Sequence, residues 1–157
     1  MLLIWNAISL LIIVFHVYPF LKFIENHQMI YLWFALGIIL MDLTIKCIKA
    51  MFHGTSYGVL KRPIGARGCD AFCVKGDFSG KPGFPSGHVA ASAFFFTMLW
   101  FISPLSSRVY IFVSGFITIL LVAIARVQKK CHNMFQVISG GLYGFLFSIV
   151  WFKLFKT

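Results

Sequence analysis

The sequence predicts an all-α fold, a polytopic membrane helix bundle of about five transmembrane helices with one long glycine-rich loop. The chain has 157 residues, of which 60% are hydrophobic and only 11% charged, whereas about a quarter of the residues of a soluble domain are charged. The apolar residues form uncharged runs of membrane-spanning length, and the basic residues gather in the short segments between these runs. A chain of this length is expected to form one domain, over residues 1–157.

The first predicted helix covers residues 1–21, which carry no charged side chain. A cleaved signal peptide is the alternative for an apolar segment at this position. We expect a retained membrane span, because the apolar run is long and because it lacks both a preceding basic region and a small-residue cleavage site.

Four further spans are expected from the same criteria of length and hydropathy. They cover residues 29–48, 86–105, 108–126 and 133–153. Five spans bring the long loop 49–85 and the turn 127–132 to the same face of the membrane. Every residue that we consider a candidate for chemistry lies in or beside these two segments.

The loop contains seven glycines and two prolines within residues 54–84. Loops of this length inside a compact domain are either functional or disordered. The mixture of cysteine, phenylalanine and basic residues favours an ordered loop that carries part of an active site.

Small residues recur every four positions in the last span, at Gly140, Gly144 and Ser148. This spacing lets helix backbones approach closely in lipid, where apolar burial gives little drive for association. We expect these residues to pack within the bundle, with homodimerisation as the alternative.

The net charge of +10 is compatible with nucleic acid or with anionic lipid as a partner. Because the basic residues lie between apolar runs, we expect membrane lipids and phosphate esters as partners, and no nucleic acid. The positive-inside rule would place the loop 49–85 in the cytoplasm. The rule does not apply to basic residues that bind a ligand, so the orientation in the membrane stays open. The oligomeric state also stays open.

The four cysteines do not form a metal-binding pattern. Cys69 and Cys73 are close in sequence, but no second pair follows and only His53 lies nearby, so we expect no zinc site. A disulfide between Cys69 and Cys73, or between Cys69 and Cys131, is expected if the loop faces an oxidising compartment. Free buried thiols are the equal alternative.

The tetrapeptide Pro85-Ser86-Gly87-His88 stands at the start of the third predicted span. Ser86 is a suitable N-cap, and the free N–H groups and partial positive charge of a helix N-terminus bind phosphate. Gly87 lets a ligand approach the backbone, and His88 can protonate a leaving oxygen. The alternative is a simple capped helix with a histidine at the membrane interface.

A second pattern, Arg126 followed by His132, brackets the turn between the last two spans. A charged arginine at membrane depth is costly and indicates a function by default, and its donors suit phosphate oxygens. Gln136 lies one helical turn after His132. Its amide oxygen can hold the proton of one ring nitrogen and leave the other nitrogen free as a nucleophile. The alternative is that Arg126 and His132 only extend their polar ends to the membrane surface.

Asp42 and Lys46, near the end of the second span, are expected to pair because residues four apart share a helix face. The pair is either structural, or it presents Lys46 to a phosphate at the membrane edge. Lys49, almost one turn later, can replace Lys46 in that role. In the loop, Arg62 beside Lys61 forms a basic corner.

These residues resemble the type 2 phosphatidic acid phosphatase superfamily, whose relatives include glucose-6-phosphatase and vanadium haloperoxidases. The pattern of that family is K-x6-R-P, then P-S-G-H, then S-R-x5-H-x3-D. Residues 85–88 match the second motif in full. Arg62-Pro63 matches the end of the first motif, and Arg126 with His132 matches the third. The resemblance covers about residues 42–145, and its second and third motifs are specific.

The sequence departs from this pattern at three positions. Thr55 stands where the first motif has its lysine, so assigning Lys46 to that motif requires an insertion. Ala125 replaces the usual serine, and Gln136 replaces the usual aspartate. With valine after both Arg126 and Gln136, the third motif is similar to the R-V-x4-H-x3-Q-V pattern of the dolichyl diphosphatase branch and of some plastid lipid phosphate phosphatases.

The resemblance implies an integral, multi-pass membrane phosphatase, with the endoplasmic reticulum or another internal membrane as its site. It implies that His132 attacks phosphorus to form a phosphohistidine, that Gln136 orients His132, and that His88 protonates the leaving group. The residues implied to hold the phosphate are Lys46, Arg62, Ser86, Gly87 and Arg126. No metal and no other cofactor is implied.

The implied substrate is a lipid phosphate or diphosphate, and the Q-V pattern favours a polyprenyl diphosphate. The alternatives are phosphatidate or a related lipid phosphate, and transfer of the phosphoryl group to an alcohol instead of water. Two non-enzymatic alternatives are a membrane protein that binds phospholipid without catalysis and a structural bundle whose motif match is fortuitous.

Overall fold

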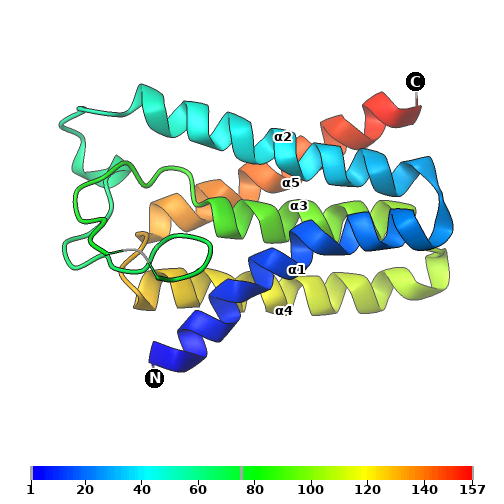
Figure 1. Cartoon of the computed structure of the whole chain (residues 1–157), viewed down its shortest axis with the longest axis horizontal. Helices are drawn as coiled ribbons and strands as arrows, with labels where there is room; N and C mark the ends of the chain where they lie inside the picture. Colours follow the sequence, from blue (N-terminus) through cyan, green and yellow to red (C-terminus); the bar gives the residue numbers. More distant parts are fainter. Residues whose placement is uncertain (1, 75, 157) are drawn as a thin grey trace.

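The computed structural model describes residues 2–74 and 76–156, and within these residues it is all-helical. The helices are α1 (Leu2–Asn26), α2 (Met29–Met51), α3 (Gly87–Ile102), α4 (Leu105–Gln128) and α5 (Met134–Lys156), with a short 3₁₀ turn, η1 (Gly58–Leu60), in the loop (Figure 1). This architecture confirms the predicted polytopic helical bundle.

Successive helices run in alternating directions along the bundle (Figure 1). The long loop between α2 and α3 and the turn between α4 and α5 therefore lie at the same end of the molecule, as predicted. We call this end the loop end and the opposite end the far end. The N-terminus lies at the loop end and the C-terminus at the far end (Figure 1).

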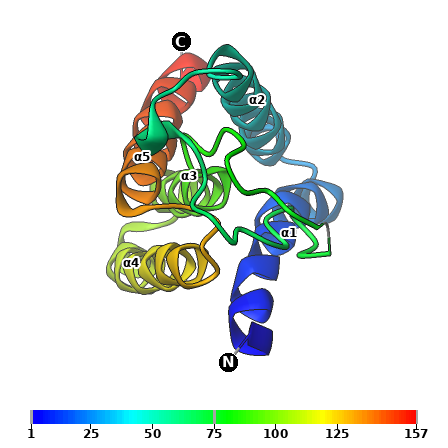
Figure 2. The same cartoon turned by 90° about the vertical axis from the view of Figure 1, so that its left-hand side faces the viewer.

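Helix α3 occupies the centre of the bundle, and the other four helices surround it (Figure 2). Its phenylalanine and methionine side chains pack with those of α1 and α2 in the main apolar core. On the opposite side, the predicted small-residue stripe of α5 contacts the start of α3, where a Cβ added to Gly140 would lie 2.5 Å from the Ser86 carbonyl oxygen. A Cβ on Gly144 would collide with the Ala90 carbonyl in the same way. The stripe thus packs within the bundle.

The third helix is shorter than the predicted span 86–105. It ends at Ile102 because Ser103 precedes Pro104, and a residue before proline is driven out of the helical conformation. Its 16 residues extend about 24 Å at 1.5 Å per residue, less than the hydrocarbon thickness of about 30 Å. Helix α3 begins deeper in the bundle than the adjacent ends of α2 and α4 (Figure 1). Its N-terminus is therefore recessed below the loop.

The outer surface of the bundle is apolar. On α4, Phe112, Phe116 and Ile117 are 67%, 63% and 50% exposed, which a soluble protein would not tolerate over a whole helix face. The helices α1, α2, α4 and α5 are each long and apolar enough to cross a bilayer. The chain is an integral membrane protein.

The predicted ion pair between Asp42 and Lys46 is wrong. Asp42 instead contacts His16 of α1, whose Nε2 lies 2.8 Å from the carboxylate, and the other ring nitrogen of His16 lies 2.7 Å from the Ile12 carbonyl oxygen. Lys46 is exposed on the outer face of α2. Helix packing brings a partner to Asp42 from α1, which the spacing within α2 alone does not reveal.

The glycine-rich loop folds back on itself over the loop end. Antiparallel bridges join Lys61 to Pro82 and Arg67 to Asp77. A disulfide between Cys69 and Cys131 fastens the loop to the α4–α5 turn, so the second of the two predicted pairings forms. Cys73 remains a free thiol, as does Cys47.

Candidate active site

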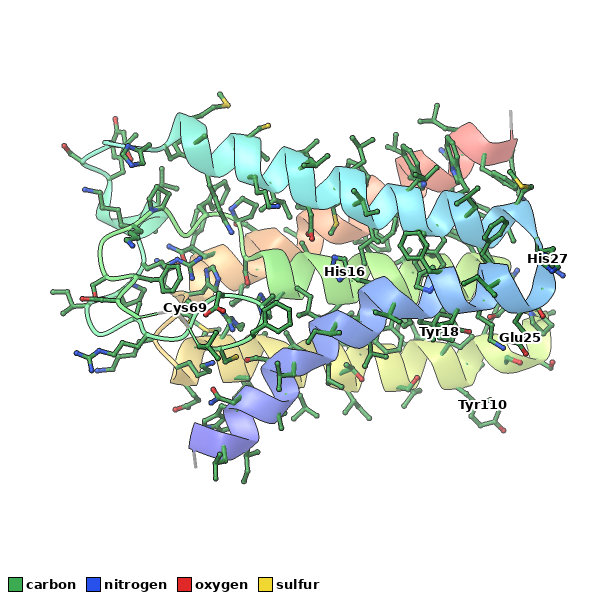
Figure 3. All side chains as sticks on the ribbon, viewed as in Figure 1. His16, Tyr18, Glu25, His27, Cys69 and Tyr110 are labelled. Carbon is green, nitrogen blue, oxygen red and sulfur yellow. A yellow bond between two sulfur atoms is a disulfide. The ribbon has the colours of Figure 1, made fainter. Side chains whose placement is uncertain are left out.

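The motif residues meet at the loop end, beneath the folded loop. Figure 3 shows Cys69 among the loop side chains at this end, whereas His16 lies midway along the bundle. The start of α3 and the start of α5 are joined directly, because the Ser86 N–H donates to the Gln136 carbonyl oxygen at 3.0 Å. This contact brings together two motifs that are more than forty residues apart in the sequence.

His132 is buried in the turn that leads into α5. The turn is held by α4, because the N–H groups of Cys131 and His132 both donate to the Arg126 carbonyl oxygen, at 2.9 and 3.2 Å. The Nδ1 atom of His132 lies 2.9 Å from Oε1 of Gln136. The imidazole is therefore fixed at both its backbone and its ring.

The Gln136 side chain determines which nitrogen of His132 carries the proton. Its Nε2 donates to two backbone carbonyl oxygens of the loop, Val59 at 3.0 Å and Lys61 at 2.8 Å. Carbonyl oxygens only accept hydrogen bonds, so the amide nitrogen must face the loop and the amide oxygen must face His132. It follows that Nδ1 of His132 is protonated and that Nε2 holds a free lone pair.

Arg62 reaches from the loop to the free nitrogen of His132. Its Nη1 donates to the Cys131 carbonyl oxygen at 3.0 Å and lies 3.5 Å from His132 Nε2, while the guanidinium rests on the Phe78 ring, 5.2 Å from its centroid. Burial lowers the pKa of Arg62 to about 10, so the group stays charged at neutral pH. Burial and then nearby positive charges, first that of Arg62, hold the pKa of His132 well below its ordinary value. His132 is thus neutral, as a nucleophile requires.

Arg126 is completely buried at the end of α4. Its Nη2 donates to the Cys69 carbonyl oxygen at 2.7 Å, and its Nη1 donates to the hydroxyl of Ser9 at 3.3 Å. Ser9 was not among the residues expected from the sequence. The available signal was a polar face in the first span, where Asn6 and Ser9 stand three residues apart in an otherwise apolar run.

Ser86 and His88 stand at the N-terminus of α3. Ser86 occupies the N-cap position, as predicted, but its hydroxyl makes no capping hydrogen bond. The side chain is fully buried and the hydroxyl has no partner. Nε2 of His88 is likewise buried without a partner. The charges of Arg62, Arg126 and Lys49 act on both His88 and His132.

Unpartnered buried polar atoms concentrate at this point. Within the described residues, five buried side-chain nitrogen or oxygen atoms lack a hydrogen bond, and four of them belong to motif residues: Arg62 Nε, Ser86 Oγ, His88 Nε2 and Arg126 Nε. Each such atom costs about 1–3 kcal/mol. A cluster of buried polar groups that lack partners, next to a helix N-terminus, suits an anion rich in oxygen atoms.

Comparison with known families gives the same assignment as the geometry. The model of the PAP2 superfamily matches residues 30–157. The chain belongs to the PAP2 superfamily. Members of this superfamily are phosphatases, so membership supports a phosphoester hydrolase in the membrane. No curated protein and no solved structure matches the chain.

The PAP2 match begins at residue 30, so the whole of α1 precedes it. Ser9, which contacts Arg126, therefore comes from a helix outside the shared region. Within the described residues, no group of three His, Cys, Asp or Glu side chains is placed to bind a metal ion.

Of the two candidate PAP2 lysines, Lys49 faces the site and Lys46 does not. A Cβ on Gly87 would lie 3.9 Å from Lys49 Nζ, next to the N-terminus of α3. Lys46 lies on the exposed face of α2. Residues three apart differ in direction by about 60° around a helix, so Lys49 is partly buried toward α3 while Lys46 stays exposed.

We expect Gln136→Ala to lower turnover by at least about 10²-fold, since loss of the correct histidine tautomer costs even more in serine proteases. Gln136→Glu should also be defective, although a carboxylate can orient an imidazole. Its second oxygen would face the carbonyls of Val59 and Lys61, where Gln136 now donates two hydrogen bonds. Turnover per mole of folded protein in purified membranes measures both effects.

Gln128→Glu is the matched control, because Gln128 is exposed at the end of α4. Full turnover of Gln136→Glu would show that the bonds to the loop carbonyls are dispensable.

The two cysteines of the disulfide each contact one arginine of the candidate site. The carbonyl of Cys69 accepts from Arg126 and the carbonyl of Cys131 accepts from Arg62. We expect reduction of this bond to lower turnover by about 10-fold or more, since both guanidinium groups lose a fixed acceptor. The Cys69→Ser/Cys131→Ser variant should show the same low turnover without any response to reductant.

Cys47→Ser is the control for reduction, because Cys47 is exposed on α2 and free. Its turnover should equal that of the unmodified protein and remain sensitive to reductant. If mass spectrometry shows that the disulfide is reduced and turnover is nevertheless unchanged, the disulfide does not support the two arginines.

Proposed function

We propose that this protein hydrolyses a lipid phosphate or diphosphate through a phosphohistidine formed on His132. The observation that carries the proposal is the unprotonated Nε2 of His132, which lies 3.5 Å from Nη1 of Arg62. Ser86 and His88, at the start of α3, also carry buried polar atoms without a partner. A neutral nucleophile next to a cluster of positive charge suits attack on a phosphate anion.

In the first step, His132 Nε2 forms a bond to phosphorus and the bond from phosphorus to the leaving oxygen breaks. His88 gives its proton to that oxygen, so that the lipid leaves as an alcohol or a lipid monophosphate. The phosphate itself favours a proton on His88, because its negative charges offset the three surrounding cations. Arg62, Arg126 and Lys49, with the Ser86 hydroxyl and the backbone N–H at Gly87, neutralise the oxygens in the transition state.

In the second step, a water molecule gives a proton to His88 and attacks phosphorus. The bond between phosphorus and His132 breaks, inorganic phosphate forms, and His132 returns to its neutral state. Gln136 keeps the Nδ1 proton in place through both steps. Lys49 takes the place that the sequence analysis gave to Lys46, because Lys49 is the lysine next to the N-terminus of α3.

A polyprenyl diphosphate is our preferred substrate, on the basis of the Q-V pattern at Gln136. A lipid substrate is supported by the recessed start of α3 and by the apolar outer surface of the bundle, since a headgroup at that depth carries its tail into the bilayer. Phosphatidate or a related lipid phosphate is the alternative substrate, and transfer to an alcohol is the alternative reaction.

We further propose that the loop end faces an oxidising compartment, such as the lumen of the endoplasmic reticulum or of another internal membrane. The support is the disulfide between Cys69 and Cys131, since disulfides persist in such compartments and are rare in the cytosol. The positive-inside rule would place the basic residues of the loop in the cytoplasm. Some of these residues belong to the candidate site, so their charge does not determine the orientation.

The deciding experiment measures phosphate release by the purified protein in detergent with a metal chelator present. The substrates are a prenyl diphosphate, phosphatidate and a soluble sugar phosphate, and we expect turnover to decrease in that order. Turnover of phosphatidate alone would reject the diphosphate preference and keep the phosphatase. Tight binding of these lipids without any release of phosphate would favour a lipid-binding protein, an alternative raised by the neutral Gln136 in place of a carboxylate.

A further inference from the structure

A second feature of the molecule lies away from the candidate active site, in the groove between α4 and α5. Helix α3 lies behind these two helices (Figure 2), and its side chains Phe96 and Trp100 are part of the lining. A cavity of about 350 Å³ lies in the groove at mid-bundle, with walls that include Phe96, Gly115, Phe116 and Phe145. Gly115 is needed here because a Cβ at this position would meet the Phe96 ring at 2.8 Å. The walls are almost entirely apolar.

The groove continues to the far end of the bundle. There a second cavity of about 420 Å³ shares Trp100, Phe101 and Ile149 with the first. Its remaining walls include Phe152 and three basic residues, Arg108, Lys153 and Lys156. The groove is therefore apolar at mid-bundle and cationic where it reaches the far membrane surface.

Two of the cations are held in position by aromatic rings of the groove. The Arg108 guanidinium lies 4.9 Å from the centroid of Trp100, and Lys156 Nζ lies 5.0 Å from the centroid of Phe152. Arg108 Nε donates to the Ser103 carbonyl oxygen at 3.3 Å, which leaves the terminal guanidinium nitrogens directed elsewhere. Such stacking orders long side chains that would otherwise lose rotamer freedom on binding a ligand.

Among the residues that the structure describes, no acidic side chain lines either cavity. The chain contains only four Asp and Glu residues. Asp42 pairs with His16, and Glu25 pairs with Lys22. The other two, Asp70 and Asp77, belong to the loop at the opposite end of the bundle. A carboxylate side chain of this chain is therefore not the counter-ion of Arg108 and Lys156.

We propose that this groove binds an anionic phospholipid from the leaflet opposite the loop end. The lipid phosphate contacts Arg108 and Lys156, and one acyl chain follows the apolar groove toward Gly115. Charge complementarity selects this occupant. A second copy of the chain would bring its own +10 net charge and its own cationic rim to the same face, and a zwitterionic lipid would cancel part of the attraction with its own cation.

The groove between α4 and α5 is open to lipid, whereas the space between α2 and α5 is closed. Helices α2 and α5 are closed at the far end by Trp33 and Trp151, which stack and donate to each other's carbonyl oxygens at 3.1 and 2.9 Å. The cationic end of the groove and the candidate catalytic residues His88 and His132 lie at opposite ends of the bundle. Lipid binding in the groove therefore does not depend on the proposed phosphatase activity.

Quenching of Trp100 fluorescence by lipids with brominated acyl chains tests the proposal directly. The protein is placed in bilayers that contain brominated phosphatidylglycerol or brominated phosphatidylcholine, and the Trp100 signal is the difference between the unmodified protein and Trp100→Phe. We expect half-maximal quenching at a several-fold lower mole fraction of the anionic lipid. Arg108→Gln/Lys156→Gln should remove this preference, and Ile149→Phe should reduce it by filling the wall shared by the two cavities.

Lys22→Gln is the matched control, since Lys22 lies near the end of α1 and pairs with Glu25 outside the groove. It should keep the full preference. Equal quenching by both lipids in the unmodified protein would overturn the proposal. The proposal would also fail if Lys22→Gln lost the preference for anionic lipid as fully as Arg108→Gln/Lys156→Gln, because general surface charge would then explain the preference. Absence of quenching by either lipid would show that another protein surface covers the groove. The readout requires no turnover, so these outcomes are independent of the phosphatase assay.

Discussion

His132→Ala abolishes phosphate release, with turnover reduced by at least about 10³-fold. The alanine removes the only group that we expect to bond to phosphorus, while Arg62 keeps its bond to the Cys131 carbonyl and Arg126 keeps its bond to the Cys69 carbonyl. Substrate binding should change much less than turnover, because the positive charges around the site remain. Rapid mixing with ³²P-labelled substrate, followed by an alkaline quench that preserves phosphohistidine, measures the labelled intermediate and the released phosphate together.

His88→Ala should behave differently in the same assay. With an activated ester that needs no proton on its leaving group, His132 is still phosphorylated, but the second step slows because His88 no longer activates water. Labelled protein should therefore accumulate in His88→Ala and be absent from His132→Ala. The exposed His53 provides the control, since His53→Ala should match the unmodified protein. Residual turnover of His132→Ala with folding intact would reject the covalent step.

Arg126→Met lowers turnover by about 10²–10³-fold, the loss found when one preorganised donor to a transition state is removed. We expect the thermal midpoint to change little. Arg126 is fully buried, and replacing a buried charge by an apolar side chain of similar length relieves a desolvation cost that offsets the lost hydrogen bonds. A functional arginine is thus distinguished from a structural one by measuring turnover and thermal unfolding on the same sample.

Lys130→Met is the control for Arg126→Met, because Lys130 is an exposed cation on the α4–α5 turn. It should leave turnover unchanged. If Arg126→Met unfolded at a much lower temperature, Arg126 would be a structural tie between α4 and the loop. If it folded and kept its turnover, Arg126 would not contact the phosphate.

The helices were predictable because lipid imposes a simple rule on the backbone. Each spanning segment must satisfy its hydrogen bonds within itself and remain apolar over its length, so uncharged runs indicate α1, α2, α4 and α5. The same rule overestimated α3. A central helix surrounded by protein does not need the full bilayer thickness, and Pro104 ends it at Ile102.

The candidate site was predictable where a motif states local chemistry. Pro85 to His88 predict a helix start, which α3 shows, and the four-residue interval from His132 to Gln136 predicts the contact between the imidazole and the amide oxygen. Phosphate binding at this helix start stays a prediction. The sequence did not distinguish Lys46 from Lys49, because that choice depends on how α2 is rotated against α3. It also missed the contact between Ser9 and Arg126, which joins residues from opposite ends of the chain.

The sequence by itself determined the class of the protein and the order of its membrane helices, and it supplied the candidate residues for phosphoryl transfer, because hydropathy and short motifs act over a few neighbouring residues. Tertiary structure alone decided which cysteines pair, which lysine faces the site and which nitrogen of His132 is free. Each of these depends on the direction of a side chain relative to another element. The amide of Gln136, held by two carbonyls of a loop about seventy-five residues earlier in the chain, shows the reason most directly.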